Sequence, residues 1–171
     1  SYGIDYNNRI PEVDTSKYGT LDENGKKITS FTYKHTKDPV IVTTGSTVIY
    51  TIRVYNEGSI SGYATELTDN IPEGLQFLPE NKTNTDYKWK MLDAEGNVTE
   101  DATKAKKITT TYLANDIMDS YQKENGTELV SFKDVKVAFK VIEPNTSNRL
   151  VINTAEISKA SDVDIDSTPG N

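Results

Sequence analysis

The stretch that decides the fold runs from Ser46 to Asn56 and reads Ser-Thr-Val-Ile-Tyr-Thr-Ile-Arg-Val-Tyr-Asn. Its residues alternate between two faces, and one face carries only apolar or aromatic side chains: Val48, Tyr50, Ile52 and Val54. A period of two in β-branched and aromatic residues is typical of a β-strand that buries one side. The stretch therefore predicts a strand whose apolar face must be covered by another layer.

Working outward, three more stretches have the same character. Tyr63 to Asp69 follows a turn and places Leu67 and Asp69 on one face, so Asp69 is an expected interior polar group. Arg149 to Ser158 reads as the last strand. Asp134 to Ile142 alternates apolar residues with Lys136 and Lys140, and its inward set is Val135, Val137, Phe139 and Val141. Each of these strands needs a facing layer.

Shorter stretches complete the pattern. Weaker strands are expected near residues 31–35, 40–42, 75–77, 87–91 and 106–112. The helical spacing of Ala114, Ile117, Met118 and Tyr121 predicts one short helix over 113–123. Short strands separated by turn residues, with almost no helix, predict an all-β antiparallel β-sandwich of seven to nine strands.

The same pattern predicts the domain organisation. Residues 1–27 are rich in turn signals and read as an N-terminal arm or extended segment, and residues 28–160 read as the sandwich. Within the sandwich, 79–131 is longer than such a fold needs and is an expected insert or long hairpin. Residues 161–171 read as an acidic linker.

Composition excludes several classes of protein. The 171 residues carry a net charge of −7, which argues against nucleic acid or an anionic membrane as the main partner. No apolar run approaches the roughly 20 residues that span a bilayer, so no membrane insertion is expected. There is no cysteine and a single histidine, which excludes thiolate and multi-histidine metal sites. No nucleophile, phosphate-loop or paired-carboxylate motif stands out, so we expect neither an enzyme nor a cofactor.

Residues 47–58, 62–65 and 68–77 together carry a recognisable pattern. They include Thr47-Val-Ile-Tyr-Thr-Ile-Arg-Val-Tyr-Asn-Glu-Gly58 and Thr68-Asp-Asn-Ile-Pro-Glu-Gly-Leu-Gln-Phe77. The pattern resembles the immunoglobulin-like conserved-repeat domain of Gram-positive, clostridial-type cell-surface proteins, and Val151 to Ser158 resembles the closing strand of that repeat. The resemblance implies an immunoglobulin-like sandwich, an extracellular or cell-wall location, and neighbouring repeats of the same protein or like subunits as partners.

Many surface domains of this kind contain an intramolecular isopeptide bond between a lysine and an asparagine, assisted by a buried acid. Asn153 shares a strand face with Val151, Ala155 and Ile157, and Asp69 shares one with Leu67 and Ile71. These two expected interior polar groups are the isopeptide candidates here. No lysine partner is identified, since Lys34, Lys136 and Lys140 are expected to point outward. A bond of this kind releases ammonia and lowers the intact mass by about 17 Da. The alternative is that Asp69 caps a turn and Asn153 pairs with backbone.

Two weaker site hypotheses remain. Asp162, Asp164 and Asp166 alternate like calcium ligands, although the glycine and glutamate of a calcium loop are missing, and a solvated acidic linker is favoured. The aromatic residues Tyr87, Trp89, Tyr112 and Tyr121 could form a ligand surface for a glycan, although packing is the more common role of such residues.

These observations favour a non-catalytic structural or spacer repeat. The first alternative is an adhesin or carbohydrate-binding module that uses the insert to bind a host matrix protein or glycan. The second is a pilus-like filament subunit assembled by strand exchange, because a sandwich with an unpaired edge can accept a strand from a neighbour.

Overall fold

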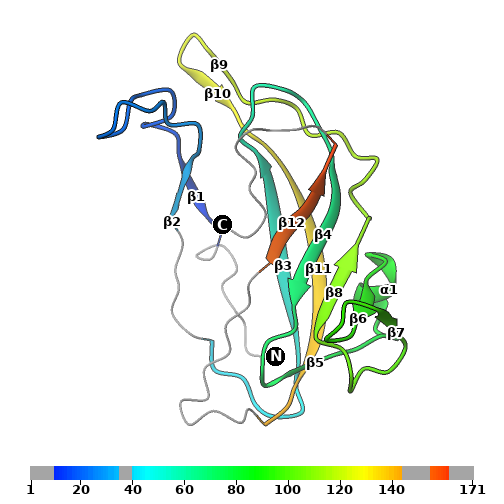
Figure 1. The fold of residues 1–171 in the computed structure, drawn as a ribbon. Helices are drawn as coiled ribbons and strands as arrows, with labels where there is room; N and C mark the ends of the chain where they lie inside the picture. The colour runs from blue at the N-terminus through cyan, green and yellow to red at the C-terminus, as the bar shows by residue number, and fades with distance from the viewer. Residues whose placement is uncertain (1–9, 35–39, 144–154, 162–171) are drawn as a thin grey trace. The chain divides into compact units, whose positions relative to one another are not determined.

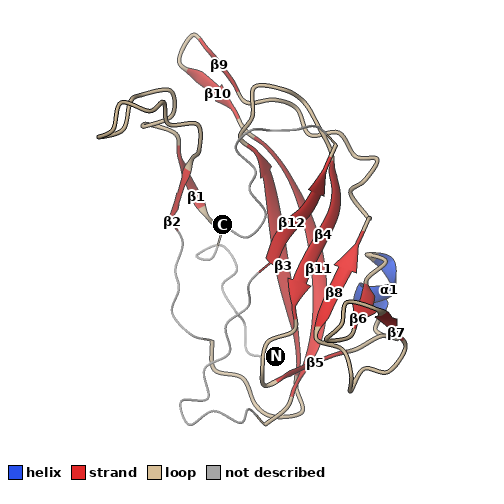
Figure 2. Ribbon diagram, viewed as in Figure 1, coloured by secondary structure: helices blue, strands red, loops and turns tan. Residues whose placement is uncertain are grey.

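The computed structural model describes residues 10–34, 40–143 and 155–161. Its secondary structure is mostly antiparallel β-sheet with one short helix, as Figure 2 shows by colour. An all-β fold is therefore confirmed. The chain divides into two compact units, Ser1–Ile41 and Val42–Asn171.

The first unit contains a small hairpin. Strand β1 (Glu12–Asp14) pairs antiparallel with β2 (Thr32–Lys34), so residues on both sides of the expected boundary at residue 27 belong together. Between the two strands, residues 22–26 form a tight turn, in which the Asp22 N–H donates to the Lys26 carbonyl over 2.8 Å. The unit ends after Ile41, whereas the sequence predicts a sandwich that starts at residue 28.

In the second unit, one sheet is built around its longest strand. Strand β11 (Ser131–Val141) lies between β3 (Thr47–Asn56) and β5 (Leu75–Phe77), and both neighbours are antiparallel to it. The pairing of β3 with β11 runs without interruption from Thr47 opposite Lys140 to Asn56 opposite Ser131. The inward residues Val135, Val137 and Phe139 are fully buried, as their alternation predicted.

The second sheet has five strands in the order β12-β4-β8-β6-β7. Its members are β12 (Ala155–Ala160), β4 (Ala64–Asn70), β8 (Lys107–Thr110), β6 (Lys90–Leu92) and β7 (Val98–Thr99). The register between β12 and β4 shifts near Ser158, which marks a β-bulge. Residues 79–131 supply three of these strands, so the expected insert is part of the sheet.

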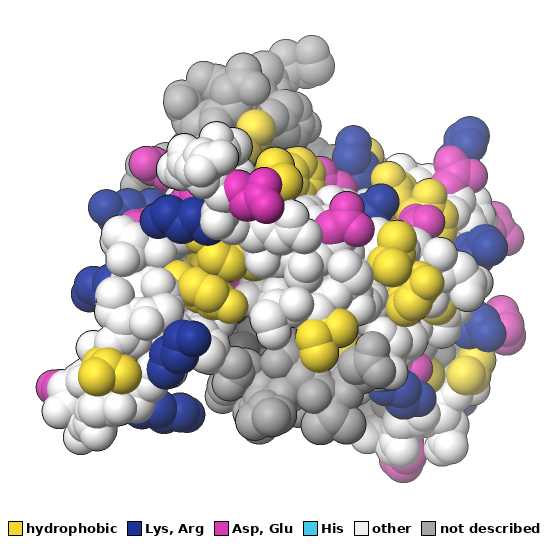
Figure 3. Space-filling view, turned by 90° about the horizontal axis from the view of Figure 1, so that it is seen from above, with side chains coloured by type: hydrophobic (Ala, Val, Ile, Leu, Met, Phe, Trp, Pro, Cys, Tyr) yellow, Lys and Arg dark blue, Asp and Glu magenta, His cyan; other side chains and the backbone are white. Residues whose placement is uncertain are grey.

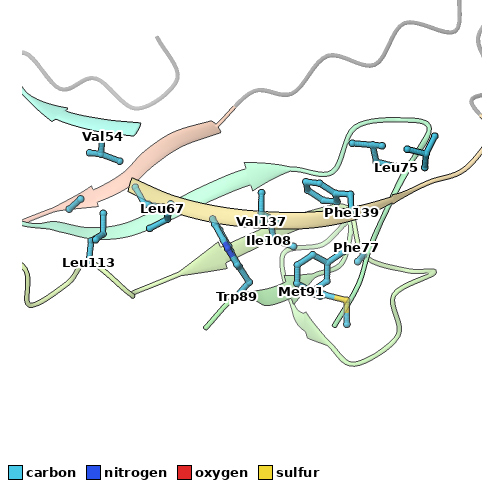
Figure 4. Packing of buried hydrophobic residues seen from close by; sticks show 14 of the residues in the cluster. Val54, Leu67, Leu75, Phe77, Trp89, Met91, Ile108, Leu113, Val137 and Phe139 are labelled. Carbon is cyan, nitrogen blue, oxygen red and sulfur yellow. The ribbon is translucent and has the colours of Figure 1, made fainter. Parts of the chain in front are cut away.

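The two sheets share one hydrophobic core. Figure 4 shows Val137 and Phe139 of β11 packed with Leu67 of β4, Ile108 of β8 and Met91 of β6. The rings of Phe77 and Phe139 meet edge to face at 6.3 Å. Because each sheet buries one face against the other, the alternating strands close a single interior.

The expected helix over 113–123 is wrong. This segment forms tight turns instead, with Ala114 donating to Thr111 and Asp116 donating to Leu113. Its next residues turn to the 58–62 segment, where Met118 exchanges both backbone hydrogen bonds with Gly62. The residues with helical spacing share no buried face, because Met118 is buried, Ile117 is half exposed, and Ala114 and Tyr121 are only partly buried.

The helix that does form is α1 (Lys82–Asp86), and Asn81 caps its start by accepting from the Thr83 N–H. The expected strand over 87–91 is correspondingly shortened to β6. Tyr87 ends the helix, and Lys88 has a φ of 57°, a left-handed conformation that interrupts an extended chain.

The hairpin of β9 (Gln122–Glu124) and β10 (Thr127–Leu129) precedes β11. Its turn places Asn125 and Gly126 at positive φ, as two-residue hairpin turns require.

Candidate functional site

Asp69 lies in the interior, as its strand face predicted. It is fully buried on β4, between Ala155 of β12 and Ile108 of β8 in the register. Burial raises the pKa of Tyr50, which belongs to the facing sheet, and the nearby Asp69 charge raises that pKa further. The structure therefore places a carboxyl group inside the core beside a phenol.

The isopeptide hypothesis needs a buried lysine beside that carboxyl group. Lys34, Lys136 and Lys140 are exposed, as expected, and no lysine in the part of the chain that the structure describes is buried. Asn153 lies outside the described residues. The described part thus supplies the acid and neither of the two groups that would be joined, and the bond stays a hypothesis for intact-mass measurement.

The four candidate aromatic residues have different surroundings. Trp89 is buried, and its indole N–H donates to the Lys136 carbonyl over 2.8 Å. Tyr87 and Tyr112 pack against each other with ring centroids 4.8 Å apart, and Tyr112 is 40% exposed. The Tyr121 N–H donates to Gly58 from the segment before β9. Trp89 therefore contributes to the core, which leaves Tyr112 as the most accessible ring of the set.

A metal site finds no support among the residues described. Within 10–34, 40–143 and 155–161, no three histidine, cysteine, aspartate or glutamate side chains are arranged to hold a metal ion. Asp162, Asp164 and Asp166 lie outside these ranges. A hollow in the first unit is lined by Lys17, Leu21 and Asp22 among others. One Asp22 carboxylate oxygen already accepts two backbone N–H groups, from Asn24 and Lys26.

The β3–β11 pair is reinforced on its outer face. The Arg53 guanidinium donates to both carboxylate oxygens of Asp134, over 2.8 and 3.0 Å, and lies 4.0 Å from the centre of the Phe132 ring. The hydrogen bond with Asp134 is the main cause that raises the pKa of Arg53. A bidentate ion pair whose guanidinium also stacks on an aromatic ring favours this register of the two strands.

A side chain continues the sheet where β5 ends. Phe77, the last residue of β5, lies opposite Phe139. At the next position, the Asn84 amide donates to the Ala138 carbonyl and accepts from the Ala138 N–H, each over 2.8 Å. Asn84 thereby replaces a paired strand residue. Further along β11, the Trp89 indole N–H donates to the Lys136 carbonyl.

The first and last strands of the second unit, β3 and β12, place the start of β3 and the end of β12 at opposite ends of the sheets. Thr47 begins β3 next to Lys140, whereas Ala160 ends β12 next to Ala64. Strand β4 starts at Ala64 and leads through a short turn to β5, which pairs with Val141. The start of β3 and the end of β12 are therefore separated by the length of the sheets, as Figure 1 shows.

The surface shows no single charged or apolar patch in the view of Figure 3. Side chains of both charges are interspersed there, and hydrophobic side chains form small separate groups. Among the described residues, no helix is long and apolar enough to cross a membrane.

Comparison with known proteins finds no matching family model, curated protein or solved structure.

Proposed function

We propose that this chain is a non-catalytic structural or spacer module of a bacterial cell-surface protein, folded as an immunoglobulin-like β-sandwich. The two antiparallel sheets around one core support the sandwich. The motifs over residues 47–77 support the surface location, because they resemble those of surface repeats. Neighbouring repeats of the same protein are the partners that this role requires.

The main support for the spacer role is the position of the two ends of the second unit, because it sets the direction of loading. A spacer is pulled at its two ends, here at the start of β3 and the end of β12. These ends lie at opposite ends of the sheets, so tension slides β3 along β11 and β12 along β4. The hydrogen bonds of an antiparallel pair are perpendicular to the strands, and sliding loads many of them at once.

Reinforcement of β3 and β11 fits the same role. The Arg53–Asp134 pair and the Phe132 ring lie across the two strands that would slide. Flanking backbone bonds from Gly45 to Val141 and from Val141 to Ser46 extend the ladder beyond the first residue of β3. A module with this arrangement should resist tension better than its modest size implies.

Single-molecule pulling in two directions tests the proposal. The chain has no cysteine, so introduced cysteines are unique handles. Handles at Thr44→Cys and Ala160→Cys load the strands in sliding geometry. Handles at Thr44→Cys and Glu143→Cys form the matched control, because both positions lie at the same end of β3 and β11 and peel the pairs apart one at a time.

We expect a several-fold higher unfolding force in the sliding geometry. An unfolding force in the sliding geometry that is equal to or lower than that of the control would contradict the spacer role. Binding of the isolated chain to a glycan array or to matrix proteins would instead favour the adhesin alternative, for which the exposed Tyr112 ring is the first residue to substitute.

A further inference from the structure

The outer edge of β3 pairs with no other strand among the described residues, and we call it the open edge. In an antiparallel pair, the residues on a strand direct their backbone groups alternately toward and away from the partner. Ala138 bonds to Asn84, on the side of β11 away from β3, and Ile49 lies opposite Ala138. The N–H and C=O groups of Ile49, Thr51 and Arg53 therefore point outward from the sheet. Among the described residues, none of these groups has a hydrogen-bond partner.

Within the part of the chain that the structure describes, this edge lacks the features that usually prevent strand pairing. Natural edge strands are short, bulged, or guarded by charged residues and proline. Strand β3 is ten residues long and regular, and its one charged residue is Arg53, which is already paired with Asp134. Ile49 is 51% exposed on this strand.

The inward face beside the open edge is incompletely covered. Val48, Tyr50 and Ile52 are only partly buried, whereas Val137 and Phe139, which lie opposite two of them on β11, are fully buried. Another strand alongside β3 would cover this inner row. It would also satisfy the outward backbone groups.

We propose that the partner is a second copy of this chain, with β3 paired antiparallel to β3 of the partner about a twofold axis at Thr51. In this register each Thr51 lies opposite its counterpart. Tyr50 then lies opposite the partner's Ile52 and Val48 opposite the partner's Val54, so every inward pair is apolar. Arg53 lies opposite the partner's Ile49, so the pairing brings no like charges together.

The self-complementarity of the edge selects a copy of the chain over another protein. The inward residues of β3 provide their own apolar partners in this register, and the outward row pairs threonine with threonine and arginine with isoleucine. Pairing two copies makes one continuous six-stranded sheet from two three-stranded ones. This inference is independent of the spacer role, because single-molecule pulling measures one copy at a time.

The test is the oligomeric state of the full chain. Sedimentation equilibrium of the wild type, up to about 1 mM where weak pairs form, should show a monomer–dimer equilibrium. Thr51→Lys should weaken dimerisation at least about tenfold, because it places two lysines across the axis. A mixture of Thr51→Lys and Thr51→Glu should recover a heterodimer.

Thr47→Lys is the matched control. Thr47 is exposed on the same face of the same strand and also lies opposite a lysine of β11, but the register places it opposite the partner's Tyr55. We expect its dimerisation constant to stay within about twofold of the wild type. Circular dichroism establishes that each variant is folded. A wild type that remains monomeric throughout, or equal effects of Thr51→Lys and Thr47→Lys, would overturn the proposal.

Discussion

The two sides of the three-stranded sheet differ in how their outward backbone N–H and C=O groups are hydrogen-bonded. On the β5 side, beyond Phe77, the Asn84 amide and the Trp89 indole form hydrogen bonds with backbone groups of β11. On the other side, the outward groups of Ile49, Thr51 and Arg53 on β3 meet no described residue. One edge is thus closed by side chains, whereas the other has no backbone partner among the residues that the structure describes.

This difference shows on which side of the sheet the stability of the fold depends on single residues. A strand neighbour distributes its hydrogen bonds over many residues, whereas Asn84 supplies both bonds of Ala138 alone. Substitutions on the closed side should therefore reduce stability. Substitutions of exposed β3 residues should change association instead.

The largest effect is expected for Asn84→Ala. This substitution leaves the fully buried N–H and C=O of Ala138 without partners, which should lower the free energy of unfolding by about 3 kcal/mol. Urea denaturation measures the change, and Asn115→Ala at an exposed position is the control. A loss below about 1 kcal/mol would mean that water replaces the amide and that the closed edge does not depend on Asn84.

A smaller effect is expected for Trp89→Phe. Phenylalanine keeps most of the aromatic packing but cannot donate to the Lys136 carbonyl, and we expect a loss of about 1–2 kcal/mol by the same measurement. Combining it with Asn84→Ala sharpens the comparison. If the two residues close one edge together, the double variant should lose less or more than the sum of the single losses. Strict additivity would show two independent contacts.

The smallest effect concerns Tyr50, on the open side. Its pKa is raised from the ordinary value of 10.0 by burial and by Asp69. Below about pH 10 the phenol is neutral in both folded and unfolded chains, so it adds no pH dependence. Above that pH the unfolded chain ionises first, and stability falls as pH rises toward the folded pKa.

Tyr50→Phe should remove this alkaline component of the unfolding curve. If a second copy covers the inner row of β3, dimerisation should bury Tyr50 further and extend the loss of stability to still higher pH. Identical alkaline curves for Tyr50→Phe and the wild type would contradict the interior position of this phenol.

Alternation alone predicted much of the core. The inward rows of β3 and β11 and the interior position of Asp69 follow from a period of two, because one face of each strand must be buried. The helix was misplaced because Ala114, Ile117 and Met118 match helical spacing by coincidence, while the real helix has only five residues and almost no apolar pattern.

The contacts that close and reinforce the sheet could not be predicted in the same way. Asn84 meets Ala138 across 54 positions in the sequence, and Arg53 meets Asp134 across 81. Both contacts depend on register, and Asn84 also depends on β5 ending at Phe77. Outward Arg53 on one strand and outward Asp134 on another were visible signals, but only their pairing order brings them together.

The bulge near Ser158 makes the β12 edge less suited to strand pairing than the β3 edge. It distorts β12, the edge strand of the other sheet next to β4, and the Ser158 hydroxyl and Lys159 are both engaged by Glu66. That edge is a poor template for a further strand, and β7, at the opposite edge of its sheet, has only two residues. Because a contact about a twofold axis uses the same edge of both copies, pairing through β3 builds a closed pair, and repeating that contact cannot propagate a chain of subunits.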